Sequence, residues 1–235
     1  MITYDTIRHT IAIVLLVILL AKFISKMFFR NNEISTRFIA RTAVFSAVAI
    51  VLYTIPFLNF SLPIFPAFLK IHLDEVPAFF AGFAYGPFSG FLVILIKTIV
   101  KLPMTSTAGV GELADFIYSV AFVVPAAFIY KKMHNLKGAF VSLLVATIVQ
   151  ILVASFVTTF VMLDVYVALY PGLTKEAILL MCQTVNPAIR NLQFDFLLMV
   201  SVPFNALKDV LVVFFTFVFY KRLRLLFMKF ETQKN

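Results

Sequence analysis

Long apolar runs are the feature that most constrains how this chain folds. Seven of them, separated by polar residues or by proline and glycine, lie near residues 10–29, 38–57, 75–89, 90–103, 112–130, 138–162 and 197–220. A helix that crosses a bilayer needs about 20 apolar residues, so seven such helices would use about 140 positions. The chain has 235 residues, of which 62% are apolar, whereas soluble domains are roughly 45–50% apolar. The sequence therefore predicts an all-α membrane protein with several spans.

The distribution of basic residues predicts an orientation in the membrane. Lysine and arginine concentrate in cytoplasmic loops of bilayer proteins. Here they gather in three groups, one flanking the junction of the first two runs and the others after the fifth and seventh runs: Lys22, Lys26, Arg30, Arg37 and Arg41; Lys131, Lys132 and Lys137; Lys221, Arg222, Arg224 and Lys229. Placing all three groups inside lets seven helices alternate, with the N-terminus outside and the C-terminus inside. The net charge of +9 is then explained by topology, and nucleic acid is not expected as a partner.

The first run leaves two interpretations open. Its uninterrupted apolar core, residues 10–21, is short enough for the apolar region of a signal peptide. However, no small-residue cleavage site follows, and Lys22 and Lys26 can extend their stems toward the membrane surface. We favour an uncleaved transmembrane helix over a cleaved signal.

Polar residues at the start of the fifth run form the first candidate site. The segment 105–115 carries Thr107, Gly109, Gly111, Glu112 and Asp115. Glycines let the backbone approach a ligand closely, and amides of the first helical turn have no partner within the helix. Glu112 and Asp115 are three residues apart and so share a helix face. The two acids either contact a ligand or only complement the helix dipole.

Lysines and an acid inside other apolar runs need partners, because ionisable groups are costly at membrane depth. Lys97 is expected to meet the face of Glu112 and Asp115 or to project into a cavity, while Lys101 is expected to reach the outer headgroups. Lys208 and Asp209 are adjacent and cannot face each other on a helix. Each therefore needs a separate partner, and a structural ion pair is at least as well supported there as a ligand contact.

Two outer segments complete the predicted site. Asn186 can donate and accept hydrogen bonds, and Arg190 follows it with five donors. The loop 57–70, which includes Phe68 and Leu69, is apolar and rich in proline although it is placed outside the membrane. It is interpreted either as a lid over an aromatic ligand or as packing on the helix ends.

Known catalytic and phosphate-binding signatures do not occur in the sequence. The chain has no GxxxxGK[ST], HExxH or GxSxG motif, and its one cysteine, Cys182, cannot form an internal disulfide. The three histidines are scattered, so a metal site is not expected. We predict no enzyme activity and no cofactor, and any uphill transport must draw its energy from a partner or an ion gradient.

Five motifs in register resemble the riboflavin-specific S components, the substrate-capture subunits of energy-coupling factor (ECF) vitamin transporters. The resemblance spans about residues 36–225 and is carried by DEVPAFFAGFAYGP (74–87), TAGVGELADF (107–116), FVVPAAFIYKK (122–132), NPAI (186–189) and PFNALKDVLV (203–212). It implies a six-helix domain, residues 36–235, that binds one vitamin near its outer face under the loop 58–74. Residues 1–35 would then be an additional N-terminal helix and a cytoplasmic linker.

The resemblance also implies partners. Family members dock on a membrane scaffold subunit that carries two ATPases, and a small-residue pattern on the first family helix serves the docking. Here the corresponding residues are Ala40, Ala43 and Ala47. Small side chains let helices approach closely in lipid, although alanine pairs are also common in membrane helices in general.

Family flavin contacts fall on the TAGVGEL stretch, near Thr158, and on Asn186 and Arg190. The chain differs from the usual family residues at three positions. Arg190 stands where family members commonly have lysine, and Asp115 stands where they commonly have asparagine. Family members also commonly have an asparagine near the position of Thr158. Riboflavin, as cargo and not as a cofactor, remains the favoured ligand, and a related flavin is not excluded. The alternatives are an S component for another vitamin, such as pantothenate or thiamine, and a stand-alone carrier that uses Glu112 or Asp115 to couple transport to protons.

Overall fold

The computed structural model describes residues 35–105 and 107–232, with side chains described up to Tyr220. The chain divides into two compact units, Met1–Ile39 and Ala40–Asn235, and the architecture below is that of the second unit. The predicted helix at 10–29 lies outside the described residues.

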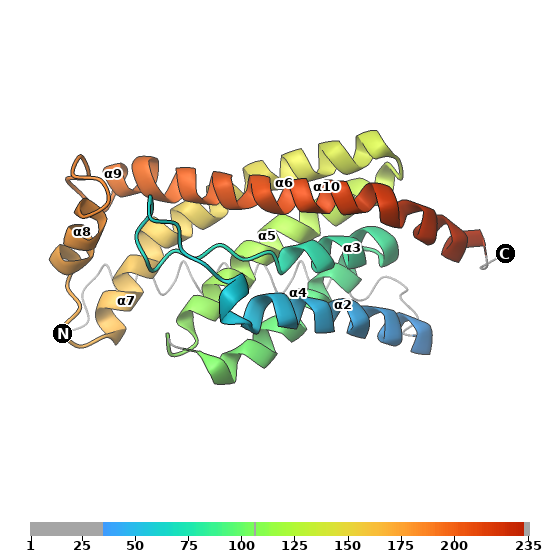
Figure 1. The fold of residues 1–235 in the computed structure, drawn as a ribbon, viewed down its shortest axis with the longest axis horizontal. Helices are drawn as coiled ribbons and strands as arrows, with labels where there is room; N and C mark the ends of the chain where they lie inside the picture. The colour runs from blue at the N-terminus through green and yellow to red at the C-terminus, as the bar shows by residue number, and fades with distance from the viewer. Residues whose placement is uncertain (1–34, 106, 233–235) are drawn as a thin grey trace, which may run out of the picture. The chain divides into compact units, whose positions relative to one another are not determined.

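All of the long secondary-structure elements in the described part of the chain are helices (Figure 1). In chain order these are α2 (Thr36–Thr54), α3 (Glu75–Tyr85), α4 (Pro87–Lys101), α5 (Val110–Lys132), α6 (Leu136–Val157), α7 (Leu163–Leu169), α8 (Lys175–Gln183), α9 (Phe194–Phe196) and α10 (Val202–Thr232). Among the residues described, five stretches are long and apolar enough to cross a membrane: Thr36–Thr54, Pro87–Met104, Val110–Lys132, Leu136–Leu169 and Phe194–Tyr220. The prediction of an all-α membrane protein is confirmed.

Local backbone geometry sets two helix boundaries, one at Gly86 and one after the sixth predicted run. The third and fourth helices separate at Gly86, whose φ of 97° suits glycine, and Pro87 opens α4 at a position where a missing N–H costs nothing. The sixth predicted run, 138–162, ends in a π-helical turn, Thr158–Met162, and the helix continues beyond it as α7. The residues between the sixth and seventh predicted runs, 163–196, therefore begin as helix and also contain α8.

Helices α3, α4 and α5 pack closely because glycines lie where they meet. A Cβ atom on Gly90 of α4 would lie 3.0 Å from the Ala78 carbonyl oxygen of α3 and 3.0 Å from a methyl carbon of Val123 of α5. Gly82 faces the same contact, with Ala127 3.0 Å from its own would-be Cβ. Larger residues at either position would push the three helices apart.

The segment between α2 and α3 folds back on itself over one end of the bundle (Figure 1). The side-chain amide of Asn59 donates to carbonyl oxygens at the end of α2, at 2.8 Å from Ile55 O and 3.1 Å from Tyr53 O. The backbones of Phe60 and Ile71 then exchange two hydrogen bonds, 3.2 and 2.8 Å long. This pairing closes the intervening residues, 61–70, into a flap.

Candidate functional site

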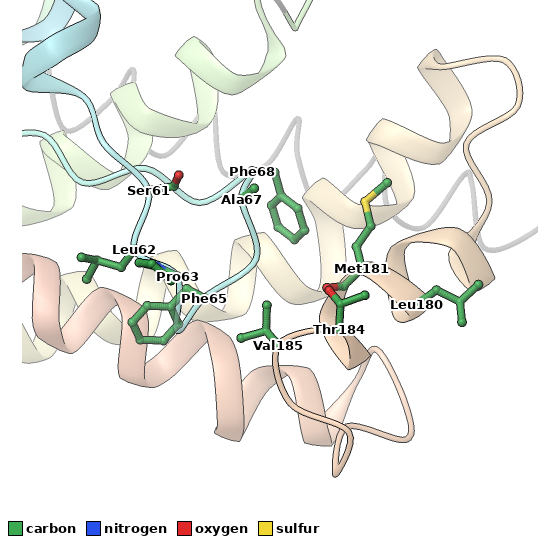
Figure 2. A pocket seen from close by; sticks show the side chains of 10 residues that line it. All are labelled: Ser61, Leu62, Pro63, Phe65, Ala67, Phe68, Leu180, Met181, Thr184 and Val185. Atoms are coloured by element: carbon green, nitrogen blue, oxygen red, sulfur yellow. The ribbon is translucent and has the colours of Figure 1, made fainter.

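A pocket of about 550 Å³ lies between the flap and α8. Figure 2 shows flap residues on one side and residues of α8 and the turn after it on the other. The lining is mostly apolar: Ser61, Leu62, Pro63, Phe65, Ala67, Phe68, Leu180, Met181, Thr184 and Val185. Ligand pockets in proteins are typically concave, mostly apolar and of about 300–1,000 Å³, so this pocket has the size and chemistry to take a planar aromatic ligand.

A cluster of apolar side chains holds the flap against α8, α9 and α10. Phe65 packs edge-on against Phe204 of α10, with ring centroids 5.4 Å apart, and Phe68 stacks on Phe196 at 6.5 Å. Leu69 packs on this cluster, which also contains Cys182 of α8. Burial raises the pKa of the Cys182 thiol to about 11. Of the two predicted lid residues, Phe68 therefore lines the pocket, whereas Leu69 anchors the flap to the cluster.

The start of α5 is organised by two threonines. The Glu112 carboxylate accepts hydrogen bonds from the hydroxyls of Thr105, at 2.6 Å, and Thr107, at 2.9 Å. The same hydroxyl oxygens accept from the backbone N–H groups of Gly109 and Gly111, each at 3.0 Å. These amides, which the sequence suggested as ligand donors, therefore have partners within the loop, and Glu112 holds the loop in shape.

Asp115 has different partners from Glu112, although the two share a helix face. Its carboxylate lies 3.1 Å from the ammonium group of Lys97 and 3.5 Å from that of Lys208. Lys97 also bonds to Asp74 and, at 3.0 Å, to the hydroxyl of Ser119. The expectation that Lys97 meets Asp115 holds in the structure, while Glu112 lies outside this set of contacts.

Six buried ionisable side chains form one network, called the ion cluster below. Its members come from the end of the flap segment and from α3, α4, α5 and α10: His72, Asp74, Glu75, Lys97, Asp115 and Lys208. Lys208 donates to Glu75 at 2.8 Å, so the predicted separate partner of Lys208 is a carboxylate of α3. His72, Asp74 and Glu75 were not predicted as site residues.

The charges of the ion cluster balance when His72 is protonated. The Nδ1 atom of His72 bonds to Asp74, and its Nε2 atom lies 3.2 Å from Asp115. Burial alone would lower the pKa of His72, but the carboxylates of Asp74, Asp115 and Glu75 outweigh burial and the nearby Lys208, and they raise it well above its usual range. Three carboxylates then face two ammonium groups and one imidazolium.

Four members of the ion cluster are of metal-ligating types, and their ligand atoms lie within 4.8 Å of one another. However, the ammonium groups of Lys97 and Lys208 bond to the same carboxylates. Cations already neutralise these acids, so the arrangement is that of an ion-pair network.

Asp209 contrasts with its neighbour Lys208. Its side chain is fully buried, and neither of its oxygen atoms has a hydrogen-bond partner among the described residues. Asp209 was expected to have a partner of its own, and the part of the chain that the structure describes does not supply one.

Two π-helical turns face each other beside the predicted Thr158 contact. One turn is Thr158–Met162, and the other, Leu197–Ser201, leads into α10. The Thr158 hydroxyl pairs with that of Tyr118 at 2.9 Å. Within the described chain, the buried hydroxyls of Thr159 and Ser201 have no hydrogen-bond partner. Turns of this type are frequent at functional sites, and nothing in the apolar pattern of the sequence indicated them.

Asn186 and Arg190 follow α8 in a tight turn. The side-chain oxygen of Asn186 accepts from the backbone N–H of Ala188 at 3.0 Å, and the backbone N–H of Arg190 donates to Asp195 at 2.8 Å. Arg190 is exposed. Asn186 directly follows Val185, which lines the pocket, so this turn lies at the pocket edge.

Helix α2 presents its small residues away from the rest of the bundle. Ala40, Ala43 and Ala47 are exposed, whereas the opposite face buries Thr42, Ser46, Ala49 and Tyr53. Thr42 bonds to Ser89 of α4 at 2.8 Å. The predicted docking residues therefore share one accessible face of the helix.

Comparisons with known proteins agree with this architecture. A sequence model of the family described as "ECF transporter, substrate-specific component" matches residues 37–220. The riboflavin transporter FmnP of Bacillus subtilis is 30% identical over 188 residues, covering 78% of this chain and 92% of its own. The riboflavin transporter RibU of Staphylococcus aureus is 26% identical, covering 78% of this chain and 89% of its own.

A solved structure, described as the S component of a bacterial ECF transporter, superimposes with a TM-score of 0.63 at 25% identity, over 80% of this chain and 95% of that one. The relatives are transporters, in agreement with the prediction that the chain is not an enzyme. Together with its apolar helices, the matches make the chain a multi-pass membrane protein, and it belongs to the family of substrate-specific components of ECF transporters.

Proposed function

We propose that this protein captures riboflavin outside the cell and delivers it inward as the substrate-specific component of an ATP-driven ECF transporter. The observation that carries the ligand assignment is the apolar pocket of about 550 Å³ between the flap and α8. A flavin has a planar tricyclic ring, which is stabilised by aromatic and aliphatic walls such as Phe65, Phe68 and Leu62. The names of the relatives support the same ligand.

The polar contacts in this proposal come from two groups of residues. Asn186 and Arg190, at the pocket edge, would pair with the polar rim of the ring. At the start of α5, the side chains of Thr107 and Glu112 would contact the hydroxylated chain, and Gly109 and Gly111 would let it approach the backbone closely. In the π-helical turn after α6, Thr158 would contact the same chain. Lys97 and Asp115 would support ligand binding indirectly, because they bond to the ion-cluster residues at the base of the flap.

Orientation and partners follow from charge and family. The basic segments 131–137 and 221–229 are placed in the cytoplasm, which puts the flap and α8 outside and the C-terminus inside. We propose that the face of Ala40, Ala43 and Ala47 docks on the membrane scaffold subunit, which carries two ATPase subunits.

Riboflavin binding to the purified protein tests the ligand assignment. Protein from cells grown with riboflavin is expected to carry yellow flavin absorbance, and stripped protein is expected to quench riboflavin fluorescence on titration. Phe68→Ala removes a pocket wall and should weaken binding by about tenfold or more. Phe57→Ala, at an 88% exposed position outside the pocket, is the matched control. Colourless protein that does not bind riboflavin at about micromolar concentration, or that instead binds thiamine or pantothenate, would contradict the proposal.

A further inference from the structure

The flap is held in two chemically different ways. Its tip packs on the bundle through apolar side chains, with Phe65 on Phe204 and Phe68 on Phe196. Its base is closed by the Phe60–Ile71 pairing and leads directly into His72 and Asp74 of the ion cluster. Tip and base are therefore expected to differ in how readily they leave the bundle.

The ion cluster joins the base of the flap to four helices at once. Asp74 bonds to Lys97 of α4, and His72 reaches Asp115 of α5 and lies 3.7 Å from Glu75 of α3. Lys208 of α10 lies 3.3 Å from His72. These partners are separated by up to 136 positions in the chain, so the cluster fixes the base against the whole bundle instead of one neighbour.

Breaking such a network is costly, because removing one partner leaves another buried charge without compensation. The base is therefore expected to open less often than the apolar tip. Since the flap forms one wall of the pocket, the position of its base decides whether the tip closes over the pocket in the correct place.

We propose that His72 and Asp74 are positioning residues for ligand binding, which act through the ion cluster to hold the base of the flap so that its tip closes in one register over the bound ligand. This inference rests on the proposed function, because it concerns how long riboflavin stays in the pocket. The residues do not line the pocket themselves, and their effect is exerted through Phe65 and Phe68.

Stopped-flow measurement of riboflavin fluorescence tests this inference. His72→Gln and Asp74→Asn are expected to raise the dissociation rate constant by about tenfold or more and to change the association rate constant by less than about threefold. Asp74→Glu, which keeps the charge, should restore much of the slow dissociation. Lys70→Gln, an exposed position on the same flap, is the control. If both cluster variants dissociate riboflavin as slowly as this control, the inference is overturned.

Hydrogen exchange of the unmodified protein provides a second test that needs no variant. Without ligand, amides at 71–74 are expected to be protected while amides at 61–69 exchange, and riboflavin should protect the tip. Equal exchange at base and tip in the free protein would overturn the inference. This contrast is measured even if riboflavin does not bind, so failure of the proposed function and failure of the inference give different results.

Discussion

At the scale of the residue, the adjacent side chains Lys208 and Asp209 illustrate how burial and pairing combine. Lys208→Met removes the partner of Glu75 and leaves that carboxylate buried without its main cation, so the free energy of unfolding should fall by about 3–5 kcal/mol. Asp209→Asn replaces a carboxylate that has no described partner and should change the free energy of unfolding by less than about 1 kcal/mol. Thermal unfolding in detergent measures both, and equal losses would contradict the ion-cluster assignment.

His72 gives the protein a pH dependence whose sign follows from its surroundings. It faces Asp74, Glu75, Asp115 and Lys208, and the Tyr53 ring of α2 lies 5.3 Å from its own; Lys97 completes the cluster. Because the folded-state pKa of His72 is raised, its stabilisation is fully present below the usual histidine pKa of about 6.5 and is lost as the pH rises through the raised value. Melting temperatures measured upward from pH 6 should therefore fall more steeply for the wild type than for His72→Gln. Parallel curves would contradict a protonated His72.

Residue-level chemistry was only partly predictable from the sequence. The need of Lys97 for a partner followed from its depth in an apolar run, and Asp115 was within the predicted reach. His72, Asp74 and Glu75 looked like ordinary loop and cap residues, because their partners are distant in the chain and only the fold brings them together. Three ionisable residues within the four positions 72–75, where an apolar helix begins, were a local signal that could have drawn attention to them.

At the scale of the element, close packing at Gly90 gives a separate prediction. Gly90→Ala places a methyl group 3.0 Å from a backbone oxygen of α3 and from Val123 of α5, so α4 must shift. We expect a loss of about 1–3 kcal/mol in the free energy of unfolding. Val100→Ala, on an exposed position of the same helix, should cost less than about 0.5 kcal/mol. A Gly90→Ala protein as stable as the wild type would show that the helices separate without cost.

The helices that were predicted well are those that coincide with one uninterrupted apolar run. The runs at 38–57, 112–130 and 197–220 correspond to α2, α5 and the span that includes α10. The third and fourth helices separate at Gly86–Pro87, where the glycine and proline of the sequence predict a tight turn or an interruption. The helix after residue 162 was not predicted, because the π-helical turn that leads into it leaves the hydrophobic pattern unchanged.

At the scale of the whole molecule, the proposed docking face of α2 allows transport to be tested separately from ligand binding. Ala43→Leu with Ala47→Leu enlarges the proposed docking face, so ATP-dependent riboflavin uptake with the scaffold and ATPases should fall by about tenfold or more. Riboflavin binding to the isolated protein should not change, because neither residue lines the pocket. Val141→Leu, on an exposed position of α6, is the control. If uptake survives the double substitution, the scaffold docks on another face. If vesicles that lack the ATPases take up riboflavin, and an uncoupler abolishes this uptake, the protein is a proton-coupled carrier instead.

The shortness of α3 has a consequence for what surrounds it. Its 11 residues rise about 16 Å along the helix axis, about half of the hydrocarbon thickness of about 30 Å. Its residues Glu75–Phe83 are buried, so protein and not lipid surrounds this half-length helix. The other half of that depth is left for the ion cluster at its first residue and for the segment that leads into it. Because lipid does not contact these residues, the packing of α3 should be insensitive to bilayer thickness.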